Sequence, residues 1–265
     1  MITKEEIQNY IDRVPPIPEN LKECLEYLDK KDLVKAAKSA SKDMALSSYL
    51  VNHINKPIYG FRGELTNISQ IFGALGVAKS QQLVYSYMVS LLSPKKWKFF
   101  NLNEISFYNL QAELTVLWHK ILKELKIQER DLYNAVAILP ASIIVCEALF
   151  VDREKEVQLL RSVHDIDLNT ILKRLCGMDL FDVSKEIAKR WNMSLKVQML
   201  IEASSGLKYT EDKEIEKFGK WMHLLLFFLF SKPVYIKAGL NDFINFNIEY
   251  VDDIYEEFMR IMDIS

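Results

Sequence analysis

The chain of 265 residues has few of the residues that mark several protein classes. It holds three cysteines, eight glycines and seven prolines, and it contains no CxxC pair. A disulfide framework, a cysteine-rich metal site and a glycine-rich phosphate loop are therefore not expected. Its 34 basic and 36 acidic side chains give a formal charge of −2, without the basic excess of a dedicated nucleic-acid binder. We expect no nucleic acid among its partners.

Long apolar runs are also missing. The most apolar stretch, Trp221 to Phe230, stops at Ser231-Lys232-Pro233, whereas a membrane span needs about 20 apolar residues. We interpret it as a buried core helix, and we expect no membrane span. The N-terminus, Met1 to Glu6, lacks the apolar region of a signal peptide. The cysteines lie in apolar surroundings, which suits buried free thiols in a reducing cytoplasm: Cys24, Cys146 and Cys176.

Apolar residues recur at the i, i+3, i+4 spacing of amphipathic helices along most of the chain. The clearest stripe consists of Leu114, Leu117, Trp118, Ile121, Leu122 and Leu125. Strict alternation between turn residues, the sign of a half-buried strand, is not found. The sequence therefore predicts an all-α, multi-helix bundle with essentially no sheet.

Helix breakers fall between the apolar stripes. Pro15 to Pro18 separate a short first helix from a second one. The segment from Asn55 to Gly60 ends another helix, and Gly76 is expected to stop a helix that begins at Asn67 or Thr66. The connections are short, so we expect one compact bundle whose two lobes divide near residues 93–103.

Four short motifs follow one another in the N-terminal half. They are Val14-Pro15-Pro16-Ile17-Pro18, Lys42-Asp43-Met44-Ala45-Leu46, Ile54-Asn55-Lys56-Pro57-Ile58-Tyr59-Gly60, and Asn67 through Leu75-Gly76. In this order they resemble the HDOD domain, a bacterial signalling relative of the HD phosphohydrolases. Two later stretches, Leu117-Trp118-His119 and Gly177 to Trp191, are similar to the family more loosely.

The resemblance covers about residues 13–206 and implies an HD-domain-like helical fold. It implies an HDOD-like domain at 1–206, with an N-terminal lobe at about 1–93 and a degenerate HD-like lobe at about 103–206. Residues 207–265 lie outside it, and we expect a helical extension packed on the domain. The residues expected to carry structural family signatures are Pro15, Pro18, Asp43, Asn55, Tyr59, Gly60, Leu75, Gly76, Trp118 and Trp191.

The resemblance also bears on metal binding. HD hydrolases hold their metal with a His, a His-Asp doublet and a later Asp. The resemblance aligns Leu139-Pro140 with the doublet, Leu180 with a later histidine, and Ser204-Ser205 with a closing His-His pair. His119 lies at or beside the first ligand position, and a single imidazole does not hold an ion. We therefore expect no metal, no cofactor and no catalytic residues.

One alternative remains open at this point. His164-Asp165 is the only His-Asp pair, and with His119 it offers the residue types of a metal-dependent phosphohydrolase acting on nucleotides or cyclic dinucleotides. The preferred interpretation is a solvent-facing pair in a loop, where Asp165 or Asp167 caps the next helix. We predict that His119 and this pair are too far apart to share one ion.

Three further features have structural explanations. His53 and His223 lie on apolar helix faces, and we expect both to bond to backbone in the core. The segment from Pro94 to Phe100 mixes lysines with aromatic residues. We expect its lysines to be solvated and its aromatic rings to pack inward, rather than to grip nucleic acid or lipid.

The resemblance implies a non-catalytic, cytoplasmic regulatory module of bacterial signal transduction that acts through protein–protein interaction. Its partners would be separate signalling proteins, which the sequence does not identify. We place the candidate binding surface on the connection from Asn55 to Gly63, where loops held by rigid helices commonly carry recognition. A purely structural role in ending a helix is the alternative. The candidate partner-binding residues are Lys56, Tyr59, Phe61 and Arg62.

Overall fold

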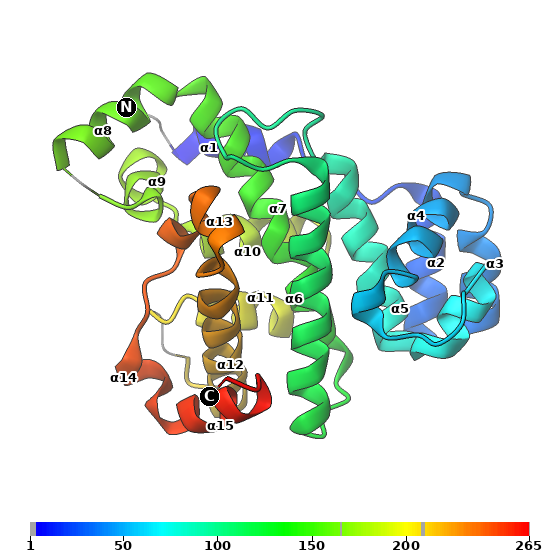
Figure 1. The fold of residues 1–265 in the computed structure, drawn as a ribbon. Helices are drawn as coiled ribbons and strands as arrows, with labels where there is room; N and C mark the ends of the chain where they lie inside the picture. The colour runs from blue at the N-terminus through cyan, green and yellow to red at the C-terminus, as the bar shows by residue number, and fades with distance from the viewer. Residues whose placement is uncertain (1–3, 165, 208–209, 265) are drawn as a thin grey trace.

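The computed structural model describes residues 4–164, 166–207 and 210–264, and the described residues form helices joined by loops, without a strand (Figure 1). This confirms the predicted fold class. The N-terminal half contains α1 (Lys4–Asp12), α2 (Glu19–Asp29), α3 (Leu33–Ala40), α4 (Met44–Ile54), the short 3-10 helix η1 (Pro57–Tyr59) and α5 (Ile68–Leu92). Then follow α6 (Glu104–Glu124), α7 (Arg130–Asp152), α8 (Glu154–His164), α9 (Leu168–Cys176), α10 (Leu180–Arg190) and α11 (Leu195–Ala203). The remainder consists of α12 (Lys213–Phe230), α13 (Pro233–Lys237), η2 (Leu240–Phe243), α14 (Ile248–Val251), η3 (Asp252–Ile254) and α15 (Tyr255–Ile261).

Helix α7 forms the centre of the core. It packs against α5, α6, α10 and α11, and its side chains are buried around most of its circumference. Within the described residues it is the one helix long and apolar enough to cross a membrane, yet 83% of its most apolar window is buried inside the protein. Such burial is typical of a core helix that is hydrophobic all round. The three free cysteines are buried, as predicted.

The helices fall into two groups in Figure 1, with α2, α3 and α4 on one side and α6 to α15 on the other. Helix α5 joins the groups, because it packs against α3 and α4 as well as against α7. Helix α1 immediately precedes α2 in the sequence but belongs to the other group in space, because it packs on α7, α9 and α10. The polypeptide thus crosses from one group to the other between α1 and α2.

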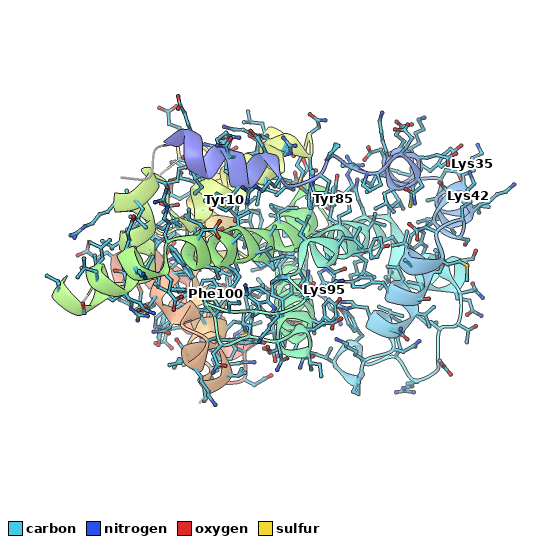
Figure 2. All side chains as sticks on the ribbon, turned by 90° about the horizontal axis from the view of Figure 1, so that it is seen from above. Tyr10, Lys35, Lys42, Tyr85, Lys95 and Phe100 are labelled. Atoms are coloured by element: carbon cyan, nitrogen blue, oxygen red, sulfur yellow. The ribbon has the colours of Figure 1, made fainter. Side chains whose placement is uncertain are left out.

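The proline-rich segment between α1 and α2 is held by the end of α10. Trp191, which is 1% exposed, donates its indole N–H to the Pro15 carbonyl at 3.0 Å. The Arg190 guanidinium donates to the carbonyls of Val14 and Asp12. The Tyr85 ring, labelled in Figure 2, stacks on Trp191 with centroids 6.5 Å apart. Two signature residues from opposite ends of the family match therefore contact each other.

The crossing from α5 to α6 packs its aromatic rings inward. Trp97 and Phe100 are buried, whereas Lys95 and its neighbouring lysines are exposed (Figure 2). The Glu147 carboxylate of α7 accepts hydrogen bonds from the backbone N–H groups of residues 98–100. The predicted packing of this segment is confirmed, because the rings of Trp97 and Phe100 lie inward while the lysines are exposed.

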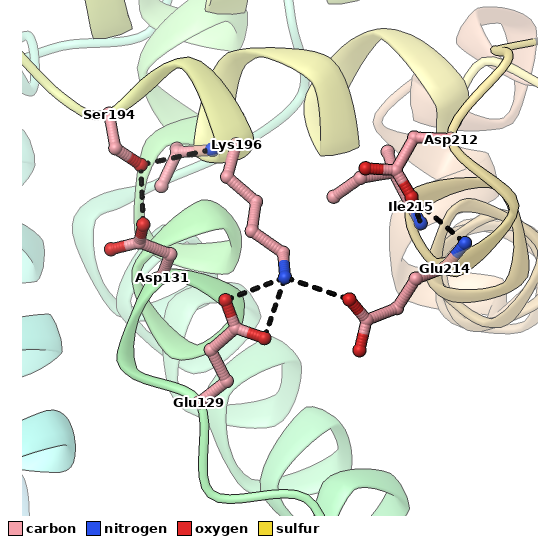
Figure 3. Close-up of polar contacts among 8 residues, drawn as sticks. Glu129, Asp131, Ser194, Lys196, Asp212, Glu214 and Ile215 are labelled. Atoms are coloured by element: carbon pink, nitrogen blue, oxygen red, sulfur yellow. Dashed lines mark hydrogen bonds and ion pairs between the residues drawn. The ribbon is translucent and has the colours of Figure 1, made fainter.

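Residues after 206 pack against the preceding helices. Helix α12 contacts α6 and α11, and its buried face includes Ile215, Phe218, Met222 and Leu225. Figure 3 shows the polar side of this contact, where the Lys196 ammonium of α11 lies 2.6 Å from Glu129 and 3.1 Å from Glu214. Burial lowers the pKa of Lys196, but hydrogen bonds to the two carboxylates outweigh it and leave the pKa raised. One cation thus links the start of α7 to the start of α12.

Candidate functional site

The connection from α4 to α5 is closed by the side chain of Asn55. Its amide nitrogen donates to the Val51 and Leu65 carbonyls at 3.0 and 2.9 Å, and its oxygen accepts the Leu65 N–H at 2.9 Å. The amide therefore pairs with both backbone groups of a residue ten positions further on. This gives a physical reason for asparagine at the centre of the signature, because a planar amide carries a donor and an acceptor side by side.

Backbone geometry turns the chain inside this closed loop. Pro57 begins the 3-10 helix η1, and Gly60 ends it with φ at +68°, in the left-handed region that suits glycine. Gly76 has φ at 73° and ψ at 179° within α5, a conformation that is essentially restricted to glycine. The predicted stop at Gly76 is thus a break between two helical arms, since Asn67 caps the first arm and Leu92 ends the second.

Tyr59 points back from this connection toward α4. Its hydroxyl is hydrogen-bonded to Nε2 of His53, whose ring stacks on Tyr49 with centroids 5.1 Å apart. The prediction that His53 bonds to backbone is wrong, because the 3-10 turn brings a side-chain hydroxyl within reach first. Burial, followed by the positive charge of Lys56, lowers the pKa of His53 to about 3. The imidazole is therefore neutral at physiological pH.

The four candidate partner-binding residues divide into two pairs. Lys56 and Tyr59 are half-buried, and the Lys56 ammonium lies 5.7 Å from the centroid of the Tyr108 ring. Phe61 is 39% exposed, and Arg62 is exposed without a hydrogen bond or ion pair inside the described chain. Ile58, at 40% exposed, adds a second apolar side chain to the same loop. Only the second pair is presented directly to solvent.

A pocket of about 130 Å³ lies between this connection, α5 and α6. The connection contributes Tyr59 and Phe61, α5 contributes Lys79 and Gln82, and α6 contributes His119. The fold thus brings His119 together with two of the candidate partner-binding residues. Sequence reasoning missed Lys79 and Gln82, which belong to no motif.

The pocket lining does not fit a metal ion. His119 Nε2 is buried, its ring contacts Tyr133 at 4.9 Å between centroids, and burial followed by the charge of Lys79 lowers its pKa to about 3. The described lining residues supply one imidazole and no carboxylate, whereas a catalytic zinc site uses three protein ligands. No group of three or more His, Cys, Asp or Glu side chains with metal-site geometry occurs in the described parts of the chain.

The structure describes only part of the alternative metal-ligand set, which consists of His119, His164 and Asp165. His119 lies in α6, whereas His164 is the last residue of α8. Helix α8 lies at the edge of the molecule in Figure 1. Asp165 lies outside the described residues. Asp167 caps α9 by accepting the Thr170 N–H at 2.7 Å, as expected for this stretch. The prediction that these groups do not share one ion stays a prediction.

The positions aligned with the other metal ligands are filled by core residues. Leu139, Pro140 and Leu180 are buried, and Ser204 is wholly buried with its hydroxyl bonded to the Leu200 carbonyl. His223 Nδ1 bonds to the Ser204 carbonyl at 3.1 Å, which confirms the predicted backbone partner for that histidine. These side chains serve packing and backbone pairing.

The fold is shared with known proteins. The family model described as HDOD domain matches residues 14–206. A structure from Shewanella amazonensis SB2B named "Putative phosphohydrolase" is 18% identical, with a TM-score of 0.64 and 98% coverage of both chains. An HDOD domain protein of unknown function from Geobacter sulfurreducens is 15% identical, with a TM-score of 0.63 and coverage of 98% of this chain and 95% of that one.

A third similar structure, from Marinobacter aquaeolei VT8, is named "Putative signal transduction protein". It is 15% identical, with a TM-score of 0.60, and the match covers 98% of this chain and 64% of that longer one. At these identities the solved structures show a shared fold. Curated proteins give no match. The family model, which spans most of the described helices, shows that this chain belongs to the HDOD domain family.

Proposed function

We propose that this protein is a non-catalytic regulatory module of bacterial signal transduction that acts in the cytoplasm by binding another protein. Membership of the HDOD family supports this role, as does the likeness to a structure named as a signal transduction protein. The family is related to the HD phosphohydrolases, so the proposal has to account for the absence of catalysis as well as for binding.

The observation that carries the binding role is the loop between α4 and α5. We call the exposed side chains of Ile58, Phe61 and Arg62 the connection surface. Exposed apolar groups on a loop that is held by Asn55 can bind without a large loss of conformational entropy. The free guanidinium next to them suits a partner with an apolar side chain beside a carboxylate.

The lack of catalysis is supported by the donor set around His119. Metal-assisted hydrolysis requires an ion that polarises phosphate and activates water. Leucine, proline and serine stand at the positions aligned with the family ligands, and none of them replaces an imidazole or a carboxylate at a hydrolytic metal. The remaining imidazole is buried and neutral, with a pKa of about 3.

The binding role is tested by replacing Phe61 and Arg62 together with alanine. Both side chains are exposed, so the melting temperature should stay within about 2 °C of the parent, in line with surface changes of about 0.5 kcal/mol. Capture of a defined partner from a bacterial lysate should be lost. The matched control replaces exposed Ile105 and Lys96, which lie outside the connection, and should retain the partner. A folded double variant that still captures every partner would move the site elsewhere.

The enzyme alternative is tested separately with phosphodiesterase, nucleotidase and pyrophosphohydrolase substrates in the presence of manganese, nickel or iron. We expect turnover at the level of a mock purification. Turnover that disappears in a folded His164→Ala or His119→Ala variant would establish a hydrolase and overturn the non-catalytic proposal.

A further inference from the structure

Two polar residues that line the pocket beside His119 have side-chain atoms without a hydrogen-bond partner among the described residues. Gln82 is fully buried, and its Nε2 donates to Thr115 Oγ1 at 2.8 Å and to Ser86 Oγ at 3.1 Å. Its amide oxygen is buried and has no hydrogen-bond partner among the described residues. Nε2 of His119, on α6, is also buried and has no hydrogen-bond partner among the described residues. Two unpaired polar atoms around one pocket are unusual, because buried polar groups are normally hydrogen-bonded.

The pocket also contains an uncompensated positive charge. Lys79 lies one helical turn before Gln82 on α5, it is half-buried, and it forms no ion pair within the described chain. Burial and the nearby charge of Lys123 lower its pKa. The lining described for the pocket supplies no carboxylate to balance this ammonium. An anion in the pocket would therefore be attracted by the positive charge of Lys79 and would take the place of the water that this ammonium has lost through burial.

The remaining walls are apolar and aromatic. Tyr59 and Phe61 form one side, and Leu75 and Leu83 contribute to the others. A cavity of roughly 150 Å³ lined by apolar side chains binds benzene in another protein, so a pocket of about 130 Å³ that opens to solvent has room for one six-membered ring with a charged substituent at its mouth. Small-molecule sites usually have this composition, a mostly apolar pocket with a few polar groups.

We propose that this pocket binds a small aromatic carboxylate whose ring carries an O–H or N–H donor. The carboxylate pairs with the Lys79 ammonium. The ring donor pairs with the Gln82 amide oxygen, which has less than 1 Å² of accessible surface in the unliganded protein and is uncovered by a side-chain movement on binding. The ring lies against Tyr59 and Phe61. Because Phe61 also belongs to the connection surface, the ligand would occupy the inner side of the loop whose outer side we assign to a partner. The ligand site itself does not depend on that assignment.

The test uses the full chain and isothermal titration with 3-hydroxybenzoate and 4-hydroxybenzoate. At least one should bind saturably with a stoichiometry of one. Benzoate, which lacks the donor, and 3- and 4-hydroxybenzyl alcohol, which lack the charge, should each bind at least tenfold more weakly. Equal affinity for hydroxybenzoate and benzoate would overturn the role of Gln82, and no saturable binding of either hydroxybenzoate would overturn the site.

Protein variants supply the second arm. Lys79→Gln should weaken hydroxybenzoate binding at least tenfold, and Lys79→Arg should restore most of the affinity because it keeps the charge. Lys123→Gln removes the same charge from α6 outside the pocket lining and should change affinity less than threefold. Equal effects of Lys79→Gln and Lys123→Gln would indicate general electrostatic attraction and would overturn the proposal. A crystal soaked in hydroxybenzoate whose pocket contains water only would do the same.

Discussion

The side chain of Asn55 takes the place of a backbone partner for Leu65. Its amide offers a donor to the Leu65 carbonyl and an acceptor to the Leu65 N–H, both at 2.9 Å. A loop that leaves a helix exposes backbone groups that need partners, and a side-chain amide can satisfy them where no strand is available. The position of Phe61 and Arg62 therefore depends on a residue that is itself half-buried below them.

Replacing Asn55 with alanine should lower the free energy of unfolding by about 3 kcal/mol, because it removes three hydrogen bonds that each contribute about 1 kcal/mol. Asn55→Asp should also destabilise, since its carboxylate faces the Leu65 carbonyl without a proton to donate. Urea denaturation measures both effects. Exposed Asn52 on the same helix makes no hydrogen bond through its side chain among the described contacts, so Asn52→Ala should change stability by about 0.5 kcal/mol or less. Equal losses at the two positions would contradict this account.

His53 makes stability depend on pH. The side chain is 3% exposed and its pKa is lowered to about 3 in the folded protein, below the ordinary value of 6.5. Below pH 6.5 the unfolded chain therefore takes up a proton that the folded chain does not bind, and this contribution to stability is lost as pH falls toward 3.

Between pH 7 and pH 5 this proton should cost about 2 kcal/mol of unfolding free energy. His53→Gln should lower stability at pH 7, because the Tyr59 hydroxyl loses its partner, but it should lose less stability than the parent on acidification. Urea denaturation at both pH values gives the difference, in which all other titrating groups cancel. Parallel pH profiles for parent and variant would show that the pKa of His53 is not lowered by folding, and would contradict this account.

Helix α5 consists of two arms joined at Gly76. The backbone there has φ at 73° and ψ at 179°, and a Cβ built on it would meet nothing within 4 Å. Any cost of a side chain at this position therefore comes from backbone strain alone. Gly73, three residues earlier in the same helix, has the same open surroundings without a positive φ.

This pair predicts opposite effects of one substitution. Gly76→Ala should destabilise by about 1–3 kcal/mol, the cost of holding a non-glycine residue in this region. Gly73→Ala should stabilise by about 0.5–1 kcal/mol, because alanine favours a helix more than glycine does. Thermal and urea unfolding of both variants provide the comparison. A neutral or stabilising Gly76→Ala would mean that the two arms can join as one continuous helix.

Elements were more predictable than their contacts. The stripe around Leu114, the cap at Asp167 and the break at Gly76 depend on residues close together in sequence, and the structure has each of them. Local spacing determines these features because helix period and capping act over one or two turns. The partner of His53 could not be found this way, since it depends on how a 3-10 turn folds back.

At the scale of the whole molecule, the candidate site exists only because segments distant in sequence come together in the folded chain. Its walls come from the connection, from α5 and from α6, and no short motif links Gln82 to His119. A buried glutamine in an apolar stretch was the available signal, and helical periodicity alone does not show that its amide oxygen lacks a partner. The location of α1 beside α7 and α10 is likewise a result of tertiary packing.

The segment from α12 to α15 is expected to be part of the stable unit although the family match ends at 206. The α12 face of Ile215, Phe218, Met222 and Leu225 is at most 2% exposed, and it covers α6 and α11. Deleting residues 207–265 would expose both sides of that contact, which creates an apolar patch of the kind that promotes aggregation. The truncated chain should be insoluble or should lose cooperative unfolding in calorimetry.

A cleavage experiment separates loss of contacts from loss of chain continuity. A protease site placed between Leu207 and Glu211 cuts the backbone but leaves the packed faces and the Lys196–Glu214 ion pair intact. After cleavage the two fragments should co-elute in gel filtration and should separate only in denaturant, because the buried α12 face holds them together. Lys196→Met should not separate them, since exposed ion pairs contribute about 1 kcal/mol or less. A 1–206 fragment that elutes alone, remains soluble and unfolds at the parent temperature would identify the segment as an independent tail.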